Sequence, residues 1–534
     1  MKKFFSLVLG AILVGGFASC NNDDLTVKGG EAEGEQVYLS FKVQNGVDTR
    51  SATTENGEYV STDTVEVGTD AENAISSCQI FLASTDGSLK VIANQIDKAT
   101  TDTYVASFNS KDLVPEATYH VYIVCNTTVD NLNTDALYST VKGAPLAEDL
   151  LTAEGQPANA GHFWMTNADD DTAIEFTMPD ARTLAQYNVK TNPLNLGIFN
   201  VERTVARVDY KAEKADNKYP SLDGQLNIQL VAAAPVNMNN NFYMWKRVSM
   251  DGTMNGAVRG GREKASNWVV GYDYADKLAY TGGAYAPMLY PMTDLSTLQW
   301  TDLNTLSVSD NYGDKSYKVW RYLTENIIPP VVHASGDGIT RSYENQKNGI
   351  TTGIVFKARL TAAPGSALEA SMAAGKTIYI FDNVCYGTWD DVKATVANPG
   401  GDAKKIALLA GYNRACAGVA AGVEPDAAAK ANGGFIGYTP VAGQNYCECL
   451  YYYWVRHNDN FDNRVMGNME FDIVRNNVYK LAVTNISKYG HPTSSTDPDP
   501  DPVDPNDPDE TNDYYFKVVV KVAKWVVRLN NIEF

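Results

Sequence analysis

The sequence is poor in histidine, with five residues in 534, and these five show no spacing typical of a metal site. No GxSxG or HExxH motif is present either. Basic residues are also few, because 44 Lys and Arg stand against 64 Asp and Glu and give a net charge of -20. A nucleic acid or an anionic membrane surface would need basic patches as a binding site. We therefore expect no catalytic site, no metal, no cofactor and no nucleic-acid partner.

The composition favours sheets over helices. Thirty-one tyrosines and 41 glycines accompany many threonines and asparagines, which suit strands joined by turns. Alternating or apolar runs predict strands at 36–44, 78–83, 119–125, 173–178, 202–210, 226–230, 353–360, 378–381, 450–455 and 478–486. One alanine-rich helix is expected at 404–420, inside an insertion. At this length the pattern predicts an all-β chain of two β-sandwich domains.

The N-terminus indicates export. Lys2 and Lys3 precede an apolar run that ends in Phe17-Ala-Ser-Cys20, too short for a membrane span, so residues 1–19 are predicted to be a signal peptide. The position of Cys20 resembles the lipobox of bacterial lipoproteins, in which that cysteine is acylated. The acidic residues that follow it are similar to a surface-export signal of Bacteroidota lipoproteins. The alternative is a plain secretory signal with an incidental cysteine.

Six further cysteines are available for disulfides in an exported protein: Cys78, Cys125, Cys385, Cys416, Cys447 and Cys449. The sequence alone cannot choose among their possible pairings. Cys447 and Cys449 are two residues apart on an expected strand, so they share one face and are poorly placed to bond each other. Buried or disulfide-bonded cysteines are favoured over a metal site.

The first expected strand carries a clean alternation. Val37, Leu39, Phe41 and Val43 would form its buried face. Shortly after it, Arg50 precedes Ser51 in a polar segment where a trypsin-like protease could cut. From these residues alone, a solvated loop arginine is the simpler interpretation.

The C-terminus combines a stiff linker with a hydrophobic strand. Residues 491–513 alternate proline with acidic residues and predict an extended arm of roughly 70 Å at about 3.1 Å per residue. Residues 514–534 follow and form a predicted strand with apolar side chains on both faces. We therefore expect other parts of a protein to cover both faces of this strand. A hydrophobic strand on such an arm is typical of a donor strand that completes another molecule's sheet. The alternative is a last strand that folds back into its own domain.

Several motifs in this order resemble the fimbrillins, the type V pilins of Bacteroidales, and most of all the major subunit of the short (minor) fimbriae. Residues 201–207 (VERTVAR) are similar to the signature that opens the fimbrillin second domain, and 163–167 (FWMTN) to the turn that closes the first. Residues 355–360 (VFKARL) and 474–479 (VRNNVY) look like second-domain strands. The Asp/Pro linker and a terminal strand with KWVV complete the resemblance, which spans the whole precursor.

The resemblance implies a cell-surface fimbrial subunit made as a lipoprotein precursor. Cys20 would carry the lipid that holds it at the outer membrane, and an arginine-specific protease would cut between Arg50 and Ser51. The first strand would then leave a groove for the terminal strand of an identical subunit. That donor strand would use Phe516, Val518, Val520, Val522, Trp525 and Val527.

The implied organisation has six parts. They are the signal peptide 1–19, the lipidated propeptide 20–50, the transthyretin-like sandwich domains 51–199 and 200–489, the linker 490–513 and the donor strand 514–534. Anchor and tip subunits would be further partners, and adhesion and biofilm formation the role. One alternative is a tip or accessory adhesin that binds glycans or other bacteria, and another is a secreted hydrolase on a sandwich scaffold. The segment 400–434 has no assignable counterpart in the family.

Overall fold

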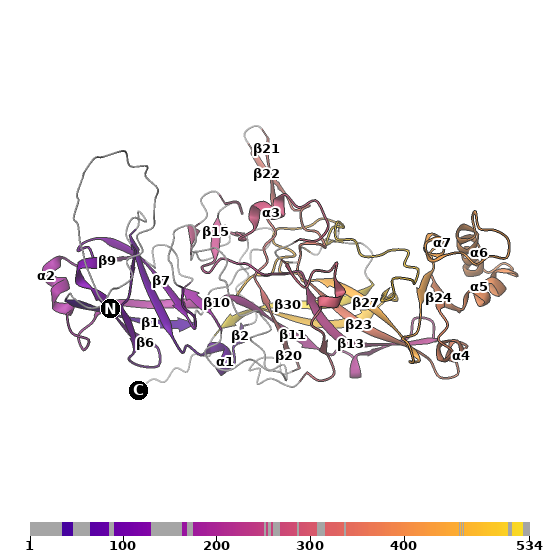
Figure 1. The fold of residues 1–534 in the computed structure, drawn as a ribbon, viewed down its shortest axis with the longest axis horizontal. Coiled ribbons are helices and arrows are strands. Elements are labelled where there is room, and N and C mark those ends of the chain that lie inside the picture. The colour runs from indigo at the N-terminus through magenta and orange to yellow at the C-terminus, as the bar shows by residue number, and fades with distance from the viewer. Residues whose placement is uncertain are drawn as a thin grey trace, which may run out of the picture.

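The computed structural model describes residues 35–45, 65–84, 90–129, 163–167, 175–249, 252–254, 258–259, 268–285, 288–306, 316–335, 338–458, 460, 462, 464–510 and 515–526. Strands dominate this part of the chain, as expected for an all-β protein. The molecule is elongated, with an N-terminal sheet at one end and a group of short helices at the other (Figure 1).

The N-terminal part is one nine-stranded sheet with the order β4-β3-β7-β8-β10-β1-β6-β5, in which β9 also pairs with β7. Its strands are β1 (Gln36–Asn45), β3 (Cys78–Ser84), β4 (Lys90–Ile92), β5 (Gln95–Lys98), β6 (Thr103–Asn109), β7 (Thr118–Cys125), β8 (Met165–Asn167), β9 (Glu175–Thr177) and β10 (Leu194–Arg203). The first and last strands of this order, β4 and β5, follow each other directly in the chain, so the sheet curls around its own inner face. Alternate residues of β1, β3, β6 and β7 point into the enclosed core.

The second part is a sandwich of two sheets. A five-stranded sheet has the order β2-β30-β28-β11-β20, and a six-stranded sheet the order β12-β13-β23-β27-β29 with β19 beside β13. The strands of the first sheet are β2 (Val65–Val67), β11 (Val205–Lys211), β20 (Lys318–Thr324), β28 (Asn477–Ile486) and β30 (Phe516–Val526). Those of the second are β12 (Lys218–Tyr219), β13 (Leu226–Val236), β19 (Thr301–Asp302), β23 (Gly353–Ala362), β27 (Tyr446–Trp454) and β29 (His491–Pro492). Their inner faces meet, for example where the rings of Tyr210 and Phe356 lie 6.0 Å apart.

Smaller elements decorate the sandwich. The short sheets are formed by β14 (Met238–Asn239) with β18 (Met288–Leu289), by β15 (Arg247–Ser249), β16 (Val258–Arg259) and β17 (Trp268–Val269), by β21 (Val331–Ser335) with β22 (Gly338–Ser342), and by β24 (Ile378–Phe381), β25 (Val384–Gly387) and β26 (Ile436–Tyr438). The α-helices are α1 (Asp70–Asn73), α2 (Ala181–Leu184), α3 (Tyr274–Leu278), α4 (Leu368–Ala373), α5 (Trp389–Val396), α6 (Ala403–Ala415) and α7 (Ala427–Asn432). Single 3-10 turns are η1 (Ser110–Asp112), η4 (Ala185–Tyr187), η5 (Ala215–Asn217) and η6 (Leu295–Thr297).

The helix expected at 404–420 is present as α6, which follows the N-cap Asp402 and ends at Ala415, five residues earlier than expected. It packs with α5, α7 and the sheet β25-β24-β26 at the far end of the molecule (Figure 1). Trp389 and Phe435 are central to this small core, with ring centroids 5.0 Å apart. The insertion is thus a folded unit with its own hydrophobic cluster.

The strand expected at 202–210 is two strands in two sheets. β10 ends at Arg203 in the N-terminal sheet, and β11 begins at Val205 in the five-stranded sheet. The buried Thr204 is therefore the point where the chain passes from one sheet to the next. The predicted domain boundary between residues 199 and 200 falls inside β10.

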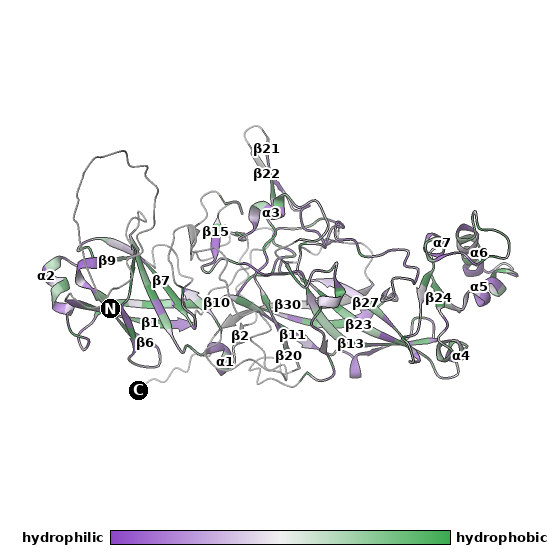
Figure 2. Ribbon diagram, in the orientation of Figure 1, coloured by the Kyte–Doolittle hydropathy of each residue, from purple (hydrophilic) through white to green (hydrophobic). Residues whose placement is uncertain are grey.

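Figure 2 shows the hydropathy of each residue along the chain, and hydrophobic residues, drawn in green, lie along strands such as β7.

Candidate functional site

The first strand, β1, lies in the interior of the N-terminal sheet. It pairs in parallel with β10 and antiparallel with β6, so strands flank it on both sides. The four side chains predicted for its buried face, Val37, Leu39, Phe41 and Val43, are at most 2% exposed. The opposite side of the strand is more accessible, with Lys42 exposed. β1 is therefore a central strand that the sheet needs for both its hydrogen bonds and its core.

Phe41 shows how β1 completes the core. Its ring stacks on Tyr104 of β6, with centroids 5.7 Å apart and an interplanar angle of 20°. Burying four apolar side chains of this size is worth roughly 1.5 to 3 kcal/mol each. The sheet would therefore forfeit on the order of 6 to 12 kcal/mol if the place of β1 stood empty.

The last strand, β30, pairs within its own chain. Its backbone runs antiparallel to β28 from Phe516, opposite Ile486, to Lys524, opposite Asn477. On its other side, the short strand β2 pairs with β30 in parallel at residues 524–526. The predicted donor residues Phe516, Val518, Val520, Val522 and Trp525 all lie on β30, and Val518 is half-buried. The structure thus places the strand in its own sandwich and does not bring it to β1.

The linker does not hold β30 away from the body, so the expectation of a free 70 Å arm is wrong for this arrangement. Residues 490–510 lie along the sandwich and form specific bonds with it. The backbone amide of Thr439 donates to Asp497 Oδ2 at 2.7 Å, and that of Gly349 donates to the carbonyl of Pro505 at 2.9 Å. The side chain of Asp509 is buried and accepts a hydrogen bond from Thr351. The composition predicted a stiff segment but could not predict this docking surface.

A cavity of about 240 Å³ lies between the docked linker and the sandwich. Aromatic side chains of β27, including Tyr452 and Trp454, line it together with Tyr515. Asp501 and Asp507 of the linker line it as well. Rings beside carboxylates form a wall on which a polar ligand with an apolar face could bind.

The VERTVAR motif supplies buried charges at the passage between the sheets. Glu202 Oε2 accepts a hydrogen bond from Lys246 Nζ at 2.8 Å. Arg207 Nη1 lies 3.0 Å from Glu72 Oε2 of α1, and both side chains are fully buried. Arg203 donates from Nε to the carbonyl of Glu72 at 2.9 Å. The motif therefore fixes α1 against the five-stranded sheet.

Desolvation sets the direction of the pKa shifts of Glu202, Arg203 and the neighbouring Tyr322. It raises the pKa of Glu202 despite the attraction of Lys246. It also lowers the pKa of Arg203 to about 10 and raises that of Tyr322, whose hydroxyl donates to Glu72 Oε1 at 2.6 Å. Such a network holds only because each charge has a partner.

The motif at 163–167 has a structural role that its sequence did not reveal. Its last three residues form the strand β8, and Asn167 Oδ1 accepts hydrogen bonds from the backbone of Ile123 at 2.8 Å and from Trp245 Nε1 at 2.9 Å. The ring of Trp245 in turn packs edge-on against Tyr122, at 5.4 Å. Asn167 therefore links the N-terminal sheet to the segment that precedes β15.

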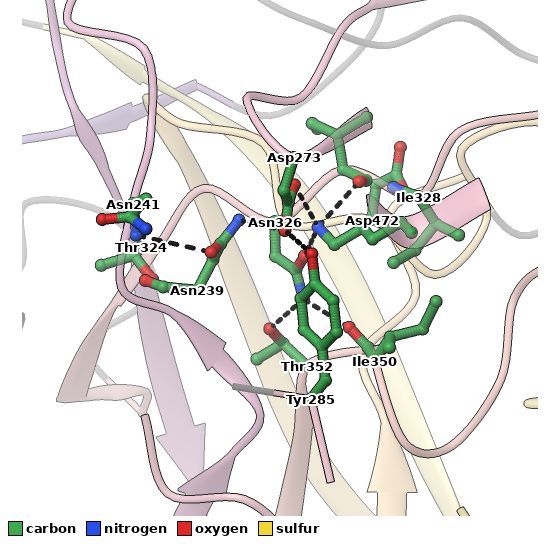
Figure 3. A network of polar contacts seen from close by, with 12 residues as sticks. Asn239, Asn241, Asp273, Tyr285, Thr324, Asn326, Ile328, Ile350, Thr352 and Asp472 are labelled. Atoms are coloured by element: carbon green, nitrogen blue, oxygen red, sulfur yellow. Dashed lines mark hydrogen bonds and ion pairs between the residues drawn. The ribbon is translucent and has the colours of Figure 1, made fainter. Parts of the chain in front are cut away.

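A second polar network joins α3, residues 326–328 and Asp472 (Figure 3). Lys277 of α3 places its Nζ 3.0 Å from Asp273 Oδ1, and the same Nζ also donates to the side chain of Asn326. Nearby, Asp472 Oδ1 accepts a hydrogen bond from the backbone amide of Ile328 at 2.8 Å. Burial raises the pKa of Asp472 to about 7, although this hydrogen bond acts in the opposite direction.

Other predicted site residues lie outside the described part of the chain: Cys20, Arg50, Ser51 and Val527. Within the described residues, no group of three or more His, Cys, Asp or Glu could hold a metal ion. No helix among them has the length and apolar character needed to cross a bilayer. Cys447 and Cys449 share the inner face of β27, as the spacing predicted, and both are buried.

The sequence did not lead us to predict β6, one of the two strands that flank β1. β6 was not predicted as a strand, although Tyr104, Ala106 and Phe108 alternate with a period of two and all three are buried. The other flanking strand, β10, was predicted only from residue 202 onward. The role of Glu72 had no local signal, because its partner Arg207 is 135 residues away.

Comparison with known proteins supports the fimbrial resemblance. Residues 444–531 match the family model described as the C-terminal part of fimbrillin, the major fimbrial subunit protein type IV. This range includes β27, β28, the docked linker and β30, and it confirms the resemblance for that segment. Among curated protein sequences, none matches the chain.

Solved structures with similar chains are distant. A candidate cell adhesion protein from Bacteroides eggerthii is 13% identical with a TM-score of 0.36, covering 94% of this chain and 99% of that one. Another from Parabacteroides distasonis is 13% identical with a TM-score of 0.37, covering 93% and 99%. The tip fimbrial protein Mfa3 from Porphyromonas gingivalis is 9% identical with a TM-score of 0.33, covering 92% and 100%.

Proposed function

We propose that this chain is a non-enzymatic structural subunit of a cell-surface fimbria, polymerised head-to-tail by donor-strand exchange. In this proposal the precursor is exported, lipidated at Cys20 and anchored in the outer membrane. An arginine-specific protease then cuts between Arg50 and Ser51. The resulting filaments, together with anchor and tip subunits, support adhesion and biofilm formation.

The observation that carries the proposal is the position of β1. This strand precedes the predicted cleavage site, yet it lies between β6 and β10 with four buried side chains. Cutting the chain after it leaves β1 held by noncovalent contacts alone. A strand of similar hydrophobic pattern could then take its place, since β-strand addition uses main-chain hydrogen bonds and pockets for alternate side chains.

The source of the new strand would be β30 of a second subunit. Because β30 pairs with β28 and β2 in the free chain, it has to leave both before it can be donated. The linker contacts at Asp497 and Asp509 would be released with it or would set how far it reaches. Donor and acceptor are different surfaces, so each contact propagates to the next subunit and the assembly is an open filament.

A defined cleavage experiment tests this function. The precursor from Asn21 to Phe534 is treated with an arginine-specific protease, the new N-terminus is sequenced and the product is imaged by electron microscopy. We expect cleavage at Arg50-Ser51 followed by filaments. The matched control is Arg50→Lys, which keeps the charge but removes the protease's preferred residue. Protection of Arg50 in the unmodified precursor would contradict the proposal and make β1 a permanent strand.

A tip or accessory adhesin is the second candidate, and the cavity beside Tyr452 and Trp454 favours it. Aromatic rings next to carboxylates are suited to stacking on a sugar while binding its hydroxyls. Cleavage at Arg50 without filament formation would favour this role. Binding of simple methyl glycosides, followed by ligand-observed NMR and lost in Trp454→Ala, would support it directly.

A further inference from the structure

Two cysteines of the N-terminal sheet face each other across neighbouring strands. Cys78 begins β3 and Cys125 ends β7, and they are direct partners in the antiparallel register. Their sulfur atoms lie 3.3 Å apart. Cys125 is buried and Cys78 is half-buried. The structure records no such sulfur contact for the other four cysteines among the described residues.

The backbone around this pair suits a covalent link. The amide of Asn126 donates to the carbonyl of Ser77 at 3.0 Å, so the neighbouring pair 77/126 is the hydrogen-bonded one. Hydrogen-bonded and non-hydrogen-bonded pairs alternate along an antiparallel ladder, which makes Cys78 and Cys125 a non-hydrogen-bonded pair. Such partners have Cα atoms about 4.5 Å apart, within the range of about 4.4 to 6.8 Å that a disulfide spans.

The pair also lies on the core side of the sheet, close to β1. Cys125 belongs to the same buried cluster as Phe41, and Cys78 packs against that cluster. Tyr104 of β6 connects them, because its ring stacks on Phe41 and its hydroxyl donates to the carbonyl of Ile75, three residues before Cys78, at 3.5 Å. A link between β3 and β7 would therefore strengthen the wall that faces β1.

We propose that Cys78 and Cys125 form a disulfide in the exported protein. The two thiols lose two protons and two electrons, and one S–S bond forms. The electrons pass to a thiol–disulfide oxidant of the export compartment, whose own disulfide is reduced to two thiols. Cys78, the more exposed of the two, attacks the oxidant's disulfide and forms a mixed disulfide. Cys125 then attacks the Cys78 sulfur and releases the reduced oxidant.

The proposed bond has a consequence that rests on the fimbrial function above. When β1 leaves after cleavage, the sheet loses a central strand and the core under Tyr104 opens. The disulfide would keep β3 and β7 in register during that interval. The subunit would then stay ready to accept a donor strand instead of opening at this wall.

The test begins with the precursor from Asn21 onward, expressed in an oxidising compartment and denatured without reductant in the presence of N-ethylmaleimide. Intact mass is expected to show two fewer labels than the same protein after reduction. A non-reduced digest should contain one peptide pair that joins Cys78 to Cys125. Full labelling without reduction, or a digest that joins other cysteines, would overturn the proposal. These readouts need no filament, so they are independent of the proposed function.

A stability measurement adds a second readout. Reduction of the wild-type precursor is expected to lower its thermal midpoint, on the order of 5–10 °C. The double variant Cys78→Ala with Cys125→Ala should be insensitive to reductant, whereas the control Cys416→Ala should respond as the wild type does. A wild-type midpoint unchanged by reductant would contradict a structural disulfide. If the double variant does not fold, the labelling of the wild type still decides the question.

Discussion

Glu72 of α1 and Arg207 of β11 form an ion pair whose side chains are both fully buried, with Glu72 Oε2 3.0 Å from Arg207 Nη1. Tyr322 donates a further hydrogen bond to Glu72. Arg207 has a second acidic partner, because its Nε lies 2.9 Å from Asp209 Oδ1. One short helix of four residues is thereby fixed to two strands of the five-stranded sheet.

The substitution Glu72→Gln should strongly destabilise the protein. It removes the carboxylate charge and leaves Arg207 with one acidic partner in a buried site, and breaking a buried pair in this way costs about 3–5 kcal/mol. The measurement is the free energy of unfolding in urea. Asp70→Asn is the matched control, because Asp70 is exposed on the same helix and should change stability by less than about 0.5 kcal/mol. Equal effects of the two substitutions would contradict the role of the pair.

Phe41→Ala should affect the precursor and the cleaved subunit differently. In the precursor it removes a fully buried ring from β1, at a cost of about 3–5 kcal/mol in the free energy of unfolding. After cleavage and loss of β1, the two proteins should be identical in stability. Thermal melts before and after protease treatment check this, with Lys42→Ala on the exposed side as control. A difference that persists after cleavage would mean that β1 stays bound.

Asp472 should make stability depend on pH. Its pKa is raised from 3.8 to about 7 by burial, so the folded protein holds this proton more tightly than the unfolded chain does. The stabilising contribution is complete below about pH 4 and is lost as the pH rises to about 7, an effect on the order of 4 kcal/mol. Asp472→Asn should remove this slope, because asparagine stays neutral and keeps an oxygen for the amide of Ile328.

The comparison is the pH profile of the urea midpoint for wild type and Asp472→Asn between pH 4 and 8. The wild type should lose more stability over this range than the variant. Asp501→Asn, at an exposed linker position, should follow the wild type. Parallel profiles for Asp472→Asn and wild type would show that Asp472 titrates normally.

Fixing β30 to β28 should block assembly. Ala482 and Val519 are register partners, so Ala482→Cys with Val519→Cys can link the two strands. The linked protein should be cleaved at Arg50 but form no filaments, since β30 cannot leave. Deleting residues 514–534 should likewise give a folded, exported protein that does not polymerise. Filaments imaged from either protein would refute donation of β30.

Reduction should restore assembly of the linked variant. Wild-type protein treated with the same reductant is run in parallel, because reduction could also act on Cys78 and Cys125. Each single variant, Ala482→Cys or Val519→Cys, should polymerise like the wild type. A failure of the single variants would show that the substitutions themselves disturb the strands.

The strands that could be predicted from the sequence are those with a strong local pattern. β24 has the bounds that its apolar run predicted, and β1 differs by one residue. The linker shows the limit of this reasoning. Its proline and aspartate content determines local stiffness, but the partners of Asp497 and Asp509 are 58 and 158 residues away. No local signal identifies such partners.

At the candidate site, too, local patterns could be predicted from the sequence, whereas partners distant in the chain could not. The buried face of β1 followed from alternation alone, and the structure agrees residue by residue. The pairing of β30 with β28 could not be chosen from the sequence, because a hydrophobic strand satisfies its hydrogen bonds equally well in its own sheet or in another molecule's. Figure 1 shows β30 within the sandwich, remote from β1.

The pairing of β1 on both sides also bears on mechanical strength. Its ladder to β6 runs from Gln36 to Lys42, and its ladder to β10 runs from Leu39 to Asn45. A strand in this place that is pulled along its own axis loads both ladders in shear, so its hydrogen bonds must break together and not one after another. A filament joined through this position would therefore resist tension along its length far better than a force that peels the strand from one end.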